Sequence, residues 1–133
     1  MSARTVFLCR LIGLYLVLAS LAMMVNKQGS VLAMNGFIGS APLHLLSGVI
    51  AVFAGLAVVL GHNVWTGGAA PILVTLIGWM ALLKGMLFLC VPTQTLAAFF
   101  EAMRFGDFFY LFAAIDLVVG AYLAWAGFSK ASG

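Results

Sequence analysis

Two oppositely charged side chains, Lys84 and Asp116, stand inside otherwise apolar stretches. Lys84 lies eight residues before Pro92, and Asp116 lies eight residues after Phe108. If both stretches are spanning helices, both charges are expected about 12 Å below the same membrane boundary. An isolated charge at that depth costs at least about 2.5–3.5 kcal/mol, and such groups usually pair or line a polar cavity. The sequence therefore predicts a buried ion pair between Lys84 and Asp116.

Two roles for this pair are open from the sequence. It either fixes the register of the third spanning helix against the fourth, or it forms a proton- or ion-linked transport site in which Asp116 takes up a proton and releases Lys84. A covalent use of the lysine has no supporting motif.

The histidines and cysteines do not form a metal or redox centre. His44 and His62 are 18 residues apart on one expected helix, about 27 Å along its axis, so they cannot share a metal or haem within one chain. Cys9 and Cys90 are expected at opposite ends of the bundle, which excludes a disulfide between them. We expect hydrogen-bonding histidines, no metal, no cofactor and no catalytic residue, because phosphate-loop and hydrolase motifs are also missing.

The composition identifies the setting in which these residues act. Of the 133 residues, 65% are hydrophobic and 7% are charged, whereas a soluble domain carries roughly 25% charged residues. So few charges cannot coat a water-facing surface, and they leave no basic patch for nucleic acid. The sequence predicts an integral membrane protein.

The apolar stretches define its fold. Four of them reach spanning length, at residues 6–25, 43–60, 72–91 and 108–128. Each is expected to be helical, because open strand edges are not tolerated in lipid. The fold class is all-α: a four-helix membrane bundle made of two tandem transmembrane hairpins, as a single domain over residues 1–133. We expect the first span to be retained, although its two arginines and its small residues also resemble a cleaved secretory signal.

One connection carries an aromatic pattern. Residues 95–105 show apolar side chains at helical spacing and are expected to form an interfacial helix. An aromatic belt is the simplest interpretation. A contact site for a lipid or a quinone-like ligand is the alternative, and its candidate residues are Phe99, Phe100, Phe105, Phe108 and Phe109.

The basic residues outside the spans suggest an orientation. Arg4, Arg10 and Lys130 share one side, and Lys27 and Arg104 share the other. The excess favours both termini in the cytoplasm.

An internal similarity appears at an offset of 65 residues. It aligns Gly13 with Gly78 and Gly55 with Gly120, and it runs without a gap. It predicts two parallel repeats related by an axis along the membrane normal. Stripes of small residues at spacings of four also favour close helix packing, within the chain or between chains.

The segment from residue 60 to residue 86, with Gly61-His62-Asn63-Val64-Trp65, Gly78-Trp79 and Leu83-Lys84-Gly85, resembles an element of uncharacterised small four-helix bacterial inner-membrane proteins. The resemblance implies a bacterial inner-membrane location and no particular activity.

Three functions remain open. The first is a non-catalytic accessory subunit or organiser of a membrane assembly, acting in the lipid bilayer as a homo-oligomer or within a larger complex. The second is a small ion- or proton-coupled transporter using Lys84 and Asp116. The third is a binder of a hydrophobic ligand at the outer aromatic residues.

Overall fold

The chain is a succession of helices joined by short connections. The computed structural model describes residues 2–104 and 106–131, without the side chains of residues 130 and 131, so Phe105 and the Lys130 side chain lie outside the described residues. The helices are α1 (Ala3–Val25), α2 (Lys27–Ile38), α3 (Ala41–Gly61), α4 (Ala69–Cys90), α5 (Thr93–Ala102) and α6 (Phe109–Ala131). Four of them, α1, α3, α4 and α6, are long and apolar enough to cross a membrane. The all-α fold with four spanning helices is therefore confirmed.

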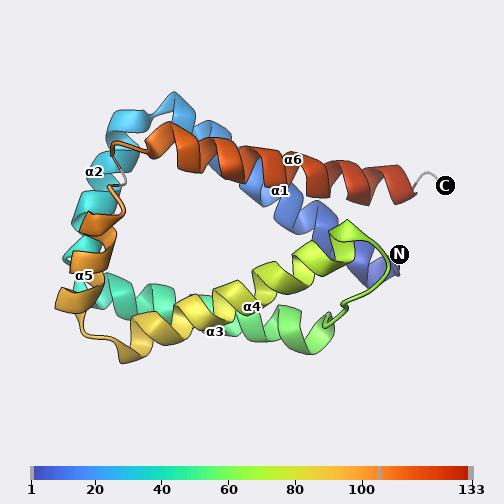
Figure 1. Ribbon diagram of the computed structural model, residues 1–133, viewed down its shortest axis with the longest axis horizontal. Coiled ribbons are helices and arrows are strands. Elements are labelled where there is room, and N and C mark those ends of the chain that lie inside the picture. The colour runs from blue at the N-terminus through green and yellow to red at the C-terminus, as the bar shows by residue number, and fades with distance from the viewer. Residues whose placement is uncertain (1, 105, 132–133) are drawn as a thin grey trace.

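The helices pack in two pairs. The chain runs out and back twice, as expected for tandem hairpins, but the extensive contacts are between α1 and α6 and between α3 and α4. The ion-pair prediction set the third spanning helix, α4, against the fourth, α6, whereas each of them packs mainly on a helix of the other half. In Figure 1 the two pairs approach each other near the chain termini and diverge toward α2 and α5.

Glycines allow each pair to pack closely. A Cβ atom added to Gly55 on α3 would lie 2.5 Å from the backbone nitrogen of Leu82 on α4. A Cβ atom added to Gly120 on α6 would lie 2.9 Å from the backbone nitrogen of Val17 on α1. Since lipid provides no hydrophobic driving force between helices, this backbone proximity is what gives the pairs their dispersion contacts.

The two glycine crossings reflect an internal duplication. The order long helix, short helix, long helix occurs twice, with α1–α2–α3 followed by α4–α5–α6. At the offset of 65 residues buried positions coincide, as with Cys9 and Val74 or Gly55 and Gly120. If each helix is replaced by its counterpart in the other half, the α1–α6 pair becomes the α4–α3 pair. The expected parallel repeats are therefore present.

The two short helices lie together at one end of the molecule. α5 occupies most of the 95–105 segment that the aromatic pattern indicated, and its Leu96 is buried. α2 was not expected, although it is the repeat counterpart of α5. The two helices contact each other across the end where the helix pairs diverge (Figure 1).

The apolar core lies at the opposite end. It consists of Cys9 from α1, Ala70 and Val74 from α4, and Leu123 and Ala126 from α6. Both described ends of the chain lie on this side, together with the α3–α4 connection (Figure 1). Ser40 caps α3, and its side chain accepts a hydrogen bond from the Leu43 backbone N–H.

Candidate functional site

Lys84 lies on the face of α4 that is directed at the other helix pair. Ala70, Val74 and Ile77 form or border the apolar core from this face. Lys84 follows Ile77 by seven residues, which is close to two helical turns and preserves the face. Its side chain is exposed, and its ammonium nitrogen lies 5.6 Å from the centre of the Phe88 ring.

Asp116 occupies the corresponding face of α6. It precedes Val119 by three residues and Leu123 by seven, and both of those residues belong to the core or pack against it. Asp116 is exposed. We call these facing sides of α4 and α6 the seam: the core fills the seam at one end, and the two charges continue it toward α2 and α5.

Lys84 and Asp116 lie on the two facing sides of the seam. Within residues 2–104 and 106–131 the two side chains form no direct ion pair. The pairing of the helices explains why. Since α4 packs on α3 and α6 packs on α1, the backbones of α4 and α6 stay apart at the level of the two charges. A direct pair inside a bilayer remains a prediction.

His62 joins three segments at the core end of the seam. Its Nε2 lies 2.9 Å from the Thr5 hydroxyl and its Nδ1 lies 3.2 Å from the Thr75 hydroxyl. Thr75 also accepts a hydrogen bond from the Val64 backbone N–H, and Arg4 donates one to the Gly61 carbonyl at 2.7 Å. The His62, Thr5 and Thr75 side chains are all buried. The expected hydrogen-bonding role of His62 is confirmed, and it is structural.

His44 has the opposite environment. It is 2% exposed, and neither ring nitrogen has a hydrogen-bond partner among the described residues. Three rings surround it: Phe37 of α2 at 4.8 Å, Phe88 of α4 at 5.6 Å and Phe100 of α5 at 6.2 Å between ring centres. The hydrogen-bonding role expected for His44 is therefore not seen, and hydropathy offered no signal for this aromatic enclosure.

The described candidate ligand residues lie on α5 and at or just before the start of α6. Phe99 and Phe100 of α5 contact each other, with ring centres 5.9 Å apart, and Phe100 also belongs to the His44 enclosure. Phe109 begins α6, is fully buried and contacts Tyr110. Phe108 is exposed. Phe105 lies outside the described residues, and a ligand at this set of residues remains a prediction.

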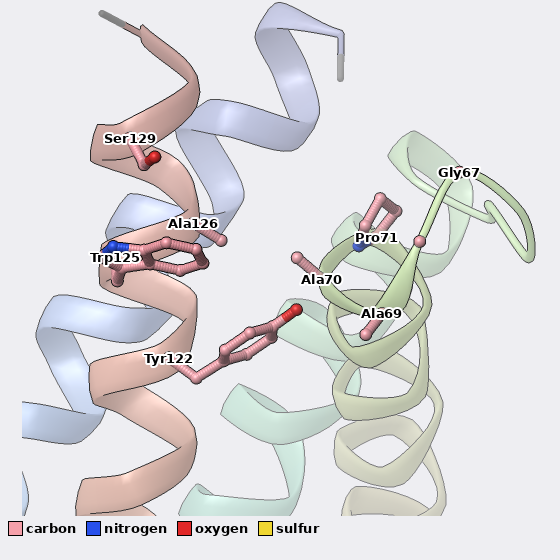
Figure 2. A pocket seen from close by; sticks show the side chains of 9 residues that line it. Gly67, Ala69, Ala70, Pro71, Tyr122, Trp125, Ala126 and Ser129 are labelled. Carbon is pink, nitrogen blue, oxygen red and sulfur yellow. The ribbon is translucent and has the colours of Figure 1, made fainter.

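A shallow pocket lies at the core end of the molecule. It has a volume of about 290 Å³ between the start of α4 and the end of α6. Figure 2 shows Tyr122 and Trp125 on α6, with the Tyr122 hydroxyl directed toward Ala69 and Ala70 at the start of α4. No described charged residue lines this pocket, and its polar side chains are those of Tyr122, Trp125 and Ser129.

The remaining reactive residues are dispersed. Cys9 is buried and Cys90 is exposed, and both are free thiols. Among the described residues no three His, Cys, Asp or Glu side chains lie close enough to hold a metal ion. Comparisons of this chain with protein-family models, with curated proteins and with solved structures found no match.

Proposed function

We propose that this protein is a non-catalytic subunit that organises a membrane assembly by binding a partner membrane chain along the seam. The observation that carries the proposal is the exposure of Lys84 and Asp116 on the facing sides of α4 and α6. Both residues belong to helices long and apolar enough to span a membrane.

Charges in this position need to be covered. An ionisable side chain facing lipid is costly, and intramembrane charges accordingly face a bundle interior or a polar cavity. The chain itself does not cover them, because the helix pairs diverge beyond the core. A partner helix with polar side chains at the same depth lowers this cost for both charges and gains dispersion contacts with α4 and α6.

The setting of this assembly follows from the sequence. The resemblance over residues 60–86 supports a bacterial inner membrane, and the arginines near the first span support cytoplasmic termini.

Thiol labelling tests this orientation. In a variant with Cys9 and Cys90 replaced by Ala, a cysteine at position 130 should resist a membrane-impermeant thiol reagent applied to intact cells. A cysteine replacing Gln28 should react. The reverse pattern contradicts this orientation.

Site-specific photocrosslinking tests the partner directly. The test position is Ala81, which lies three residues before Lys84 and near the same face of α4. The control position is Phe53 of α3, which is 77% exposed. Phe53 lies on the side of α3 opposite Ala51, the repeat counterpart of Asp116. A photoreactive amino acid at position 81 should form a discrete protein adduct in native membranes, and Lys84→Ala should abolish it. The same amino acid at position 53 should yield lipid adducts. Lipid adducts alone from position 81 contradict the proposal.

Ion-coupled transport is the second candidate. It is favoured by one observation: Lys84 and Asp116 are exposed on helices long and apolar enough to span a membrane, and the two side chains do not form a direct ion pair. This separation leaves the carboxylate free to exchange a proton or a cation. Proteoliposomes containing the wild-type chain and an internal pH dye should then pass protons down a potential, and Asp116→Asn should stop the flux. Equal flux with both proteins excludes this role.

A further inference from the structure

The imidazole of His44 presents buried hydrogen-bonding atoms that the fold leaves unsatisfied. A neutral imidazole has one N–H donor and one acceptor nitrogen. Both nitrogens are enclosed without partners by Phe37, Phe88 and Phe100. Buried polar groups in proteins are nearly always hydrogen-bonded, so each exception calls for a physical reason.

Packing does not provide that reason. The repeat counterpart of His44, 65 residues later, is Phe109, which is fully buried at the start of α6. The second half of the chain thus fills the equivalent position with an apolar ring. An imidazole at position 44 adds only its two nitrogens to what a phenyl ring supplies, and those nitrogens are the atoms that lack partners.

An apolar groove adjoins the enclosure. It has a volume of about 530 Å³ and is lined by Met23, Ser30, Ala33, Met34, Phe37 and Leu43. Phe37 belongs to both sites, since its ring faces the groove and also lies against His44. The helix that carries Phe37, α2, contains no buried residue. Weakly anchored elements open at low free-energy cost. Phe37 lies between His44 and the groove, and its side chain can therefore move aside at low cost.

We propose that His44 anchors a lipophilic ligand whose head carries a carbonyl oxygen, as in a quinone, with the apolar part of the ligand in this groove. The imidazole N–H donates a hydrogen bond to the carbonyl once Phe37 turns aside. A neutral head suits this enclosure, because the three phenyl rings that surround His44 carry no polar group. Phe88 and Phe100 provide the faces against which a planar head packs.

The test is a titration of the full chain in phosphatidylcholine nanodiscs with decyl-ubiquinone, followed by the ¹⁵N resonances of labelled histidine rings. The His44 resonances, assigned by their loss in His44→Phe, should shift saturably while those of His62 stay fixed. Decylbenzene has the same tail without a carbonyl and should cause no shift. His44→Phe should weaken decyl-ubiquinone binding by about tenfold, the loss expected for one hydrogen bond to a buried group.

A second variant guards against misfolding. His44→Phe places at position 44 the phenyl ring that the second half of the chain has at position 109. This variant should therefore melt no lower than the wild type. Ala33→Trp keeps His44 but fills the groove, and it should also lower the affinity for decyl-ubiquinone. The proposal is overturned if the His44 resonances do not move, if decylbenzene moves them equally, or if both variants bind decyl-ubiquinone like the wild type.

Discussion

At the scale of single residues, the two halves of the chain provide their own comparison. Lys84 and Asp116 have Ala19 and Ala51 as repeat counterparts, so the duplicated fold does not require charge at these places. The sequence singled out both residues, and their common depth in a membrane stays a prediction. It did not predict their separation, because hydropathy does not encode which helices become neighbours. The His44 enclosure was missed for the same reason, since its rings come from four helices.

The first prediction concerns the coupling of the two charges. Lys84→Ala and Asp116→Ala should each lower the melting temperature in detergent more than the double variant does, because each single change leaves the other charge without an opposite charge. The coupling free energy should be about 0.5–1 kcal/mol, within the range for interacting neighbours. Additive effects would mean that the charges do not interact.

The second prediction concerns the His62 network. Thr75→Val keeps the side-chain shape but removes a buried hydroxyl that lies 3.2 Å from the His62 ring and 2.8 Å from the Val64 carbonyl oxygen. The expected loss is about 1–3 kcal/mol, because buried partners are left unsatisfied. Chemical denaturation of both proteins measures it. The matched control is Thr66→Val, at an exposed site in the connection between α3 and α4. It should change stability little.

At the scale of helices, hydropathy and spacing predicted the four spans and most of α5, whereas α2 was missed although the repeat predicts it. The small residues mark where the packed helices meet. Gly13 and Gly120 meet in the α1–α6 pair, as Gly55 meets Leu82 in the α3–α4 pair. Small-residue stripes indicate that helices approach closely, but they do not specify which helix is the partner.

The third prediction tests these crossings. Gly120→Leu places a side chain where the α1 backbone lies and should destabilise the protein by about 1–3 kcal/mol or more through overpacking. Gly36→Leu on α2 adds the same side chain where no other atom lies within 4 Å. Thermal unfolding in one detergent compares them. Equal melting temperatures for the two variants would show that the α1–α6 pair is not closely packed in solution.

At the scale of the whole molecule, each half packs mainly on the other half. α1 packs on α6 and α3 on α4, so the main helix contacts join residues of different repeats. The sequence revealed the duplication but not this exchange of partners. The helices of one half can pack on each other or on the helices of the other half. Both arrangements have the same hydropathy pattern, so only the three-dimensional structure distinguishes them.

The fourth prediction follows from this arrangement. Fragments 1–66 and 67–133, expressed together with a tag on one of them, should co-purify in equal amounts, and each expressed alone should be degraded or aggregate. Gly120→Leu in the second fragment should weaken the association. Two halves that are each stable and monomeric alone would contradict the packing of α1 on α6 and α3 on α4.

The seam carries two charges, Lys84 and Asp116, that are proposed to be covered by a partner chain. The most direct measurement is native mass spectrometry of the protein extracted from its own membranes into nanodiscs. The wild-type chain should appear in a complex heavier than one copy, and Lys84→Ala combined with Asp116→Ala should reduce it to a single chain that retains its melting transition. A wild-type chain found as a lone copy, or a complex of unchanged mass in the double variant, would contradict the binding of a partner chain along the seam.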